Sequence, residues 1–179
     1  DDFYALGGPA AFDRVFLYLR DGELTEKYLL LVRADSGIKA LAGVRGRKLI
    51  LLDNVRARLA ERWLNSLLRR DGLPVLRRFA KEVAPERKPS GCIQRVFFGN
   101  ADACLVTARA YRTAVELNPQ LGRQLVVLAE SPAYVPSVVA ISVHYTAAGR
   151  TLEQGILTAH TKPKGRQVLQ IYRIDRLVR

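Results

Sequence analysis

The sequence predicts an α/β fold in which a mostly parallel sheet is covered by helices on both faces. Short apolar runs alternate along the chain with segments whose apolar residues recur at helical spacing. The change of pattern is sharpest near residue 53, where the apolar run 49–52 leads directly into a segment with helical periodicity. Because successive strands joined by a helix usually run parallel, this alternation predicts a largely parallel sheet.

Apolar periodicity and breaker residues then predict the individual elements. Uninterrupted apolar runs indicate buried strands at 28–33, 48–52, 101–107, 124–131 and 137–145. Helical spacing between caps, glycines and prolines indicates helices at 35–43, 54–70, 91–98, 108–119, 149–161 and from 163 onward. Segment 75–83 suits a short strand or a helix, segment 84–91 is predicted to be a loop, and residues 1–27 receive no element.

Length, composition and charge narrow the class of protein. The chain has 179 residues, enough for a sizeable core in one domain or in two small lobes. No apolar run approaches the roughly 20 residues that a membrane span needs. The formal net charge is +12, which suits nucleic acid, an anionic membrane or a small anionic ligand. A solvated basic surface explains the same charge.

The strand-to-helix boundary after residue 52 is a candidate anion contact. Asp53 and Asn54 form a turn pair there, and Asn54 is a good helix N-cap. The first N–H groups of a helix have no partner inside the helix, so such a start favours anions. Arg56 follows at once and can add a charge-assisted contact. The sequence therefore predicts ligand contacts at Asn54, Val55 and Arg56.

No catalytic constellation is visible in the sequence. His144 and His160 do not lie in a metal-ligand spacing, and G-x-S-x-G, Walker and G-x-G-x-x-G motifs are absent. Asp35 and Asp102 are isolated carboxylates without a partner for acid–base work. The sequence thus predicts a protein that is not an enzyme and that uses no metal or cofactor.

A run of basic residues raises nucleic-acid binding as an alternative. The run consists of Arg56, Arg58, Arg62, Arg69, Arg70, Arg77, Arg78 and Lys81. Its members within 56–70 lie largely off the apolar stripe of the predicted helix, which is where any amphipathic helix places charge. No helix-turn-helix, zinc-finger or RNP-like pattern accompanies them, so this alternative is the less favoured one.

The two cysteines, Cys92 and Cys104, do not identify the cellular compartment. Cys104 lies in an apolar strand-like run, which indicates a buried free thiol. The spacing leaves open whether the two cysteines pair in an oxidising compartment.

Four stretches, in this order, resemble the phosphate/phosphonate-type substrate-binding proteins of ABC importers. They are "LLLVRADSGIKALAGVRGRKLILLD", "VFFGNADACLVTARAYRTAVELNPQL", "LAESPAYVPSVVA" and "LTAHTKPKGRQVLQIYRIDRLV". The first contains the R-x-DSGI pattern, the second a G-x-ADA turn and the last a P-x-GRQ-x-L signature. Together they span the chain from about Tyr28 to Val178.

The resemblance implies the type 2 periplasmic-binding fold. In that fold two α/β lobes, each with a mostly parallel sheet flanked by helices, are joined by two crossover strands. We expect lobe one to comprise 1–33 and 130–179, with its N-terminal part incomplete, and lobe two to comprise 34–129. The ligand of this family lies in the cleft between the lobes.

Further ligand-binding residues follow from the resemblance. It places Asp102 in a turn that faces the ligand, and Ser131 and Tyr134 at the return crossover. Phosphonate binders of this family carry a Ser/Thr-rich loop at the start of the lobe-two helix, where this chain reads "DNVRAR". The hydroxyl groups that bind phosphonate in the family are therefore not reproduced at this position, and the expected ligand is a small anion, phosphate- or phosphonate-like.

The function implied by the resemblance is solute binding for an ABC-type importer, with its membrane component as partner. The expected location is periplasmic or secreted, with a signal peptide already removed. The alternative is a ligand-sensing periplasmic domain of a membrane signalling system. Nucleic acid is not an expected partner, and the sequence leaves the oligomeric state open.

Overall fold

The computed structural model describes residues 2–54, 57–145 and 149–179. The chain divides into two compact units, which are described separately. The central unit is Glu26–Pro136, and the terminal unit combines Asp1–Thr25 with Ser137–Arg179. The boundaries between the two units lie at 25/26 and 136/137, whereas the sequence places the lobe boundaries at 33/34 and 129/130. The lobe assignment stays a prediction.

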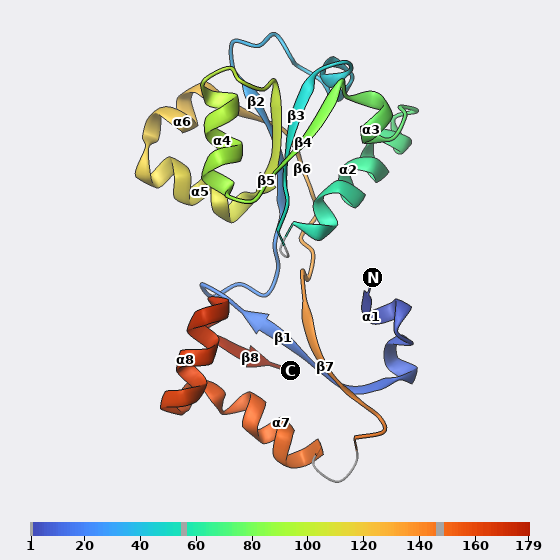
Figure 1. The fold of residues 1–179 in the computed structure, drawn as a ribbon, viewed down its shortest axis with the longest axis vertical. Helices are drawn as coiled ribbons and strands as arrows, with labels where there is room; N and C mark the ends of the chain where they lie inside the picture. The colour runs from blue at the N-terminus through green and yellow to red at the C-terminus, as the bar shows by residue number, and fades with distance from the viewer. Residues whose placement is uncertain (1, 55–56, 146–148) are drawn as a thin grey trace. The chain divides into compact units, whose positions relative to one another are not determined.

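The central unit is built on one five-stranded mixed sheet (Figure 1). Its strand order is β4-β3-β5-β2-β6. The strands are β2 (Tyr28–Arg33), β3 (Lys48–Leu52), β4 (Glu82–Glu86), β5 (Ala103–Thr107) and β6 (Leu125–Glu130). Four of the five predicted strand regions contain β2, β3, β5 and β6, and the fifth contains β7 (Val138–Ser142) of the terminal unit. The α/β class is confirmed.

The direction of β2 corrects the prediction of a mostly parallel sheet. β3 pairs in parallel with β4 and β5, but β2 runs antiparallel to both β5 and β6. The reason lies in the connection from β2 to β3, where the predicted helix at 35–43 is reduced to the 3₁₀ turn η2 (Leu41–Val44). Without a crossover helix, the chain turns back at the end of the sheet where β2 finishes. β3 therefore runs in the opposite direction to β2.

Helices cover both faces of the central sheet (Figure 1). One face carries α2 and α3, and the other carries α4, α5 and α6. Their bounds are α2 (Arg58–Arg70), α3 (Leu76–Phe79), α4 (Pro89–Phe97), α5 (Ala108–Leu117) and α6 (Pro119–Gln124). The inner strands β2, β3 and β5 read as continuous apolar runs because both of their faces are covered, whereas the outer strands β4 and β6 are partly exposed.

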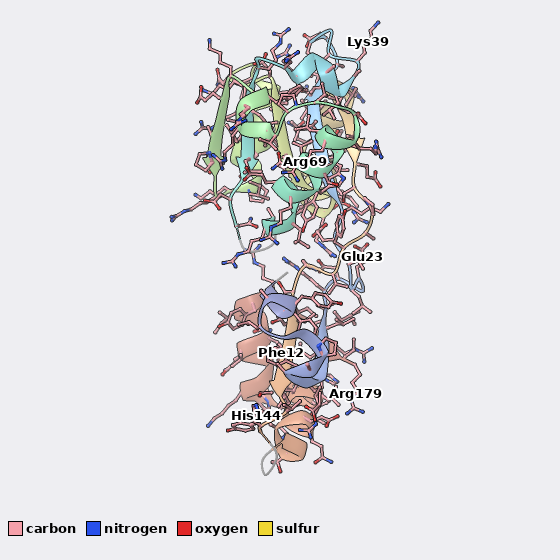
Figure 2. All side chains as sticks on the ribbon, turned by 90° about the vertical axis from the view of Figure 1, so that its right-hand side faces the viewer. Phe12, Glu23, Lys39, Arg69, His144 and Arg179 are labelled. Atoms are coloured by element: carbon pink, nitrogen blue, oxygen red, sulfur yellow. The ribbon has the colours of Figure 1, made fainter. Side chains whose placement is uncertain are left out.

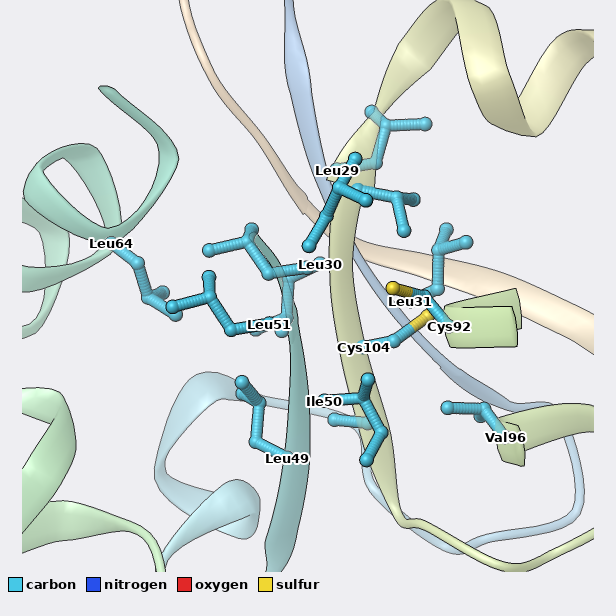
Figure 3. Packing of buried hydrophobic residues seen from close by; sticks show 14 of the residues in the cluster. Leu29, Leu30, Leu31, Leu49, Ile50, Leu51, Leu64, Cys92, Val96 and Cys104 are labelled. Atoms are coloured by element: carbon cyan, nitrogen blue, oxygen red, sulfur yellow. The ribbon is translucent and has the colours of Figure 1, made fainter. Parts of the chain in front are cut away.

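The buried layers follow from alternation along the strands. Leu30 and Leu51 both lie opposite Leu105, and Figure 3 shows them on the α2 side together with Leu64. Leu31 and Ile50 lie opposite Cys104 and face α4. The buried face of α2 is centred on Ala60, Trp63, Leu64 and Leu68.

Segment 75–83, predicted as a short strand or a helix, contains α3 and then the start of β4. The predicted loop at 84–91 is wrong, because it begins with three residues of β4 and ends with the first three residues of α4. Pro85 lies inside this strand, opposite Leu51. A proline is tolerated there because β4 is an edge strand and pairs on one side.

The terminal unit has a three-stranded antiparallel sheet in the order β7-β1-β8, not the mostly parallel sheet that was expected. Its elements are α1 (Asp2–Ala5), η1 (Gly8–Ala10), β1 (Phe12–Leu19), β7 (Val138–Ser142), α7 (Gly149–Leu157), η3 (Ala159–Thr161), α8 (Pro163–Tyr172) and β8 (Arg176–Val178). Helix α8 ends where Arg173 adopts a left-handed backbone, and β8 then pairs with β1. The predicted helix therefore does not continue to the end of the chain.

Buried hydrophobic side chains are concentrated in the central unit. Within the described residues, the buried hydrophobic residues of the terminal unit are Phe16, Ile141 and Leu169. The large cluster lies entirely within 28–125. None of the described helices is both long and apolar enough to cross a membrane.

Candidate functional site

The candidate site is one edge of the central sheet, which we call the carboxyl edge. Here β3, β4, β5 and β6 end and β2 begins. Thr107, the last residue of β5, lies opposite Tyr28, the first residue of β2. The parallel pairing of Leu51 with Leu105 brings the end of β3 to the same edge. Asn54 and Thr107 therefore lie at the ends of neighbouring strands, and each residue precedes a helix.

Asn54 does not cap helix α2 directly. The helix begins at Arg58, with Ala57 at the cap position. The Ala57 N–H donates to the Asn54 side-chain oxygen at 3.2 Å and to the Asn54 carbonyl at 3.0 Å. Asn54 thus lies three residues before the cap position and accepts the N–H of the cap residue itself. The predicted contacts Val55 and Arg56 lie outside the described residues.

The start of α5 supplies a second helix N-terminus at the carboxyl edge. Thr107 is its N-cap, and its hydroxyl oxygen accepts the Ala110 N–H at 3.2 Å. Arg109, in the first turn, lies with its Nε 3.7 Å from Oε2 of Glu26. The Arg109 and Glu26 side chains are 15% and 8% exposed, so this ion pair is largely shielded from solvent.

Tyr28, Ser131 and Tyr134 complete the edge where β2 begins and β6 ends. The rings of Tyr28 and Tyr134 stack with centroids 6.1 Å apart. Glu26 and Tyr134 exchange backbone hydrogen bonds of 2.8 and 2.9 Å, which hold the two backbone segments together. Burial, then the nearby Glu26, then Tyr134 raise the pKa of the Tyr28 phenol to about 12.

Ser131 is buried and its hydroxyl is used within the protein. The hydroxyl accepts the Tyr28 N–H at 2.8 Å and donates to the Pro132 carbonyl at 2.6 Å. Both functions of the hydroxyl are therefore engaged in holding β2 to the segment after β6.

Asp102 lies at the opposite edge of the sheet. Its carboxylate accepts the Lys48 N–H at 2.8 Å and lies 3.3 Å from Nη1 of Arg47. Both partners belong to the start of β3, so Asp102 joins the beginnings of β3 and β5. The structure brings Asn54, Ser131 and Tyr134 to the carboxyl edge and separates Asp102 from them by the length of the strands.

Glu26, Thr107 and Arg109 were missed in the sequence. A signal for two of them exists, because Thr107 stands where the apolar run 103–106 passes straight into a helix. This is the same pattern that drew attention to Asn54. Glu26 gives no such signal, since its position depends on pairing with residues more than eighty positions away.

The basic face of α2 is an ordinary solvated helix surface. Arg69 is exposed on it, and Figure 2 looks onto this side. Arg77 Nε donates to Glu61 Oε1 at 3.1 Å, and Arg70 Nε donates to Asp71 Oδ1 at 3.3 Å. Part of the positive charge is thus neutralised locally. In the part of the chain that the structure describes, no group of His, Cys, Asp and Glu is arranged to hold a metal ion.

In open α/β sheets ligands bind at the carboxyl ends of the strands, where the polar side chains described above lie. The family can then be named. The sequence model of the periplasmic substrate-binding proteins of phosphonate ABC transporters matches residues 10–179. The chain belongs to this family, and the resemblance read from the sequence is confirmed. The family consists of substrate-binding proteins of the periplasm rather than of enzymes.

Solved structures agree with the fold. XAC2383 from Xanthomonas citri, solved bound to ATP, superposes with a TM-score of 0.72 at 17% identity, covering 92% of this chain and 63% of that one. PhnD1 from Prochlorococcus marinus, solved with methylphosphonate, gives a TM-score of 0.60 at 15% identity, covering 96% and 66%. A phosphonate-transporter binding protein from Pseudomonas aeruginosa gives 0.61 at 13% identity, covering 91% and 55%.

The chain spans 63% of the length of XAC2383, and identities this low establish the fold alone. No curated protein matches the sequence.

Proposed function

We propose that this chain is a solute-binding protein of an ABC-type importer and that it binds a small anion with a phosphoryl or phosphonyl group at the carboxyl edge. One observation carries the proposal. The neighbouring parallel strands β3 and β5 both end at the carboxyl edge, and the chain leads from them to the starts of α2 and α5. Backbone N–H groups and the helix dipoles favour an anion at these two helix starts.

Arg109 is the proposed charge partner of the ligand. A guanidinium presents two parallel N–H groups that match two oxygens of a phosphonate, and partial burial strengthens such contacts. Oε2 of Glu26 lies 3.7 Å from Nε of Arg109, and this ion pair limits the movement of the guanidinium. Asn54, Val55 and Arg56 are proposed as contacts from the start of α2.

The ring of Tyr134 is the proposed wall of the site, and Ser131 is a positioning residue that holds the segment carrying Tyr134. Asp102 has no place in this proposal, because its carboxylate is bound to Lys48 at the other edge.

The test is a calorimetric titration at fixed ionic strength with methylphosphonate, inorganic phosphate, ATP and sulfate. The first and third are the ligands seen in PhnD1 and in XAC2383. Saturable binding of one of the phosphorus compounds, with sulfate weaker, is the expected result. Absence of binding to all four would overturn the proposal.

Two variants locate the site. Arg109→Gln is expected to weaken binding roughly 10-fold or more, as the loss of a charge-assisted hydrogen bond does. Arg123→Gln removes the same charge from the exposed end of α6, next to the start of β6 at the opposite edge, and is expected to leave the affinity unchanged. Equal losses in both variants would mean that overall charge, not the carboxyl edge, drives binding.

The proposed partner is the importer's membrane component in the periplasm, and the proposed role is binding without reaction. Phosphorus NMR of the ligand after prolonged incubation is expected to show an unchanged compound. A new phosphorus signal that grows with protein concentration would indicate catalysis instead.

A further inference from the structure

Cys92 and Cys104 lie in the same layer of the central core, between α4 and the sheet. Cys104 is the second residue of β5, and its side chain points to the face covered by α4 together with Leu31 and Ile50. Cys92 is the fourth residue of α4 and is fully buried, as is Val96 one turn further on. Figure 3 shows the two sulfur atoms next to each other in this layer.

An electrostatic effect agrees with this placement. Burial first, and then the Cys92 thiol, raise the pKa of the Cys104 thiol well above its usual value. Both cysteines are free and buried in the structure.

We propose that Cys92 and Cys104 form a disulfide that fastens α4 to β5 when the chain folds in an oxidising compartment. The inference rests on the proposed periplasmic location, because structural disulfides persist in that compartment and are rare in the cytosol. No other cysteine exists in the sequence, so no competing pairing can form within the chain.

The chemistry is thiol–disulfide exchange with a disulfide oxidant, either a thiol oxidoreductase or oxidised glutathione. One cysteine thiolate attacks a sulfur of the oxidant and releases one thiol of the oxidant. The second cysteine thiolate then attacks the mixed disulfide and releases the other. Two protein thiols lose two protons and two electrons, and one oxidant disulfide becomes two thiols. Because both thiols are buried, the exchange takes place while α4 is still docking.

The proposed disulfide links β5 covalently to α4, the helix that precedes it in the chain. The short loop from Cys92 to Cys104 contains the turn that joins α4 to β5, and its closure restricts the unfolded chain. The disulfide also replaces two weakly bonded thiols in a dry layer. The Cys92 thiol otherwise has a backbone oxygen, that of Glu86, at 3.9 Å.

The test refolds the full purified chain in glutathione buffers, then blocks remaining thiols with N-ethylmaleimide under denaturing conditions. The expected product in oxidised buffer carries no maleimide, has a mass about 2 Da below that of the reduced chain, and gives one cross-linked peptide. Its melting temperature is expected to lie about 6–10 °C above that of the reduced protein. Two maleimide groups per chain, or a lower melting temperature after oxidation, would overturn the proposal.

The Cys92→Ala/Cys104→Ala variant separates the disulfide from general effects of the buffer. Its melting temperature is expected to be the same in oxidised and reduced buffer. A difference equal to that of the natural chain would show that the bond is not the cause. Since mass and melting temperature need no ligand, this test stands or fails apart from the anion-binding experiment.

Discussion

Tyr28 and Ser131 are joined by two hydrogen bonds although they lie 103 positions apart in the chain. The Tyr28 N–H donates to the Ser131 hydroxyl at 2.8 Å, and the Ser131 N–H donates to the Tyr28 carbonyl at 2.9 Å. Tyr28 opens β2 and Ser131 follows β6, so this pair fastens together the two segments by which the chain enters and leaves the central unit.

Replacing Ser131 with alanine is expected to lower the free energy of unfolding by about 1–3 kcal/mol, because the buried Tyr28 N–H loses its acceptor. Denaturant unfolding measures the change. The exposed Ser90 on α4 is the matched control, and Ser90→Ala is expected to change stability by less than about 0.5 kcal/mol. Equal effects of the two substitutions would contradict the role given to Ser131.

Stability is expected to fall as the pH rises from about 10 to 12, in part because of Tyr28. The pKa of the Tyr28 phenol is raised to about 12 in the folded protein, so the unfolded chain loses this proton at lower pH. Deprotonation of the unfolded chain therefore shifts the folding equilibrium toward the unfolded state over that pH range. The difference from Tyr28→Phe is expected to grow by up to about 3 kcal/mol between pH 10 and pH 12.

The measurement is the free energy of unfolding of both proteins at several pH values. Contributions of groups that do not interact with Tyr28 are common to both chains and cancel. Parallel curves for the natural chain and Tyr28→Phe would show that the phenol is not shifted.

Asp102 is expected to matter for stability and not for binding. Asp102→Ala removes the acceptor of the Lys48 N–H and is expected to lower the free energy of unfolding by about 1–2 kcal/mol. Asp102→Asn keeps an acceptor oxygen and is expected to lose less. Anion affinity, measured by calorimetry, is expected to stay the same in both variants. A tenfold loss of affinity would instead support the ligand contact that the family resemblance implies.

Two helical glycines are expected to respond in opposite directions to alanine. A Cβ on Gly165, in the first turn of α8, would lie 2.1 Å from the Ala159 carbonyl oxygen, so the backbone of η3 must move. Gly165→Ala is expected to cost about 2 kcal/mol or more. A Cβ on Gly155 in α7 meets nothing within 4 Å. Gly155→Ala is therefore expected to stabilise the protein by about 0.5–1 kcal/mol, as alanine does in a helix interior.

Melting temperatures of the two glycine variants decide this prediction. Destabilisation by both would mean that α7 is packed on the side where Gly155 faces open space.

The sequence by itself determined most of the local structure, including the buried strands 28–33 and 48–52, the helix that ends at Arg70, and the family. These features depend on apolar spacing and on breakers within a few residues, so a single pass along the chain contains them. The same local pattern predicted Asn54 as the helix N-cap, whereas Ala57 occupies that position in the structure. The predicted loop at 84–91 failed because pairing of β4 with β3 outweighs weak local preference. The predicted helix at 35–43 is only the 3₁₀ turn η2.

Tertiary structure alone decided the direction of β2, the strand β8 and the composition of the carboxyl edge. Tyr28 meets Thr107, and Glu26 meets Arg109 and Tyr134, through strand pairing between segments far apart in the chain. The same pairing moved Asp102 to the opposite edge, beside Lys48. Register and strand direction are properties of such long-range pairs, and no periodicity within one segment encodes them.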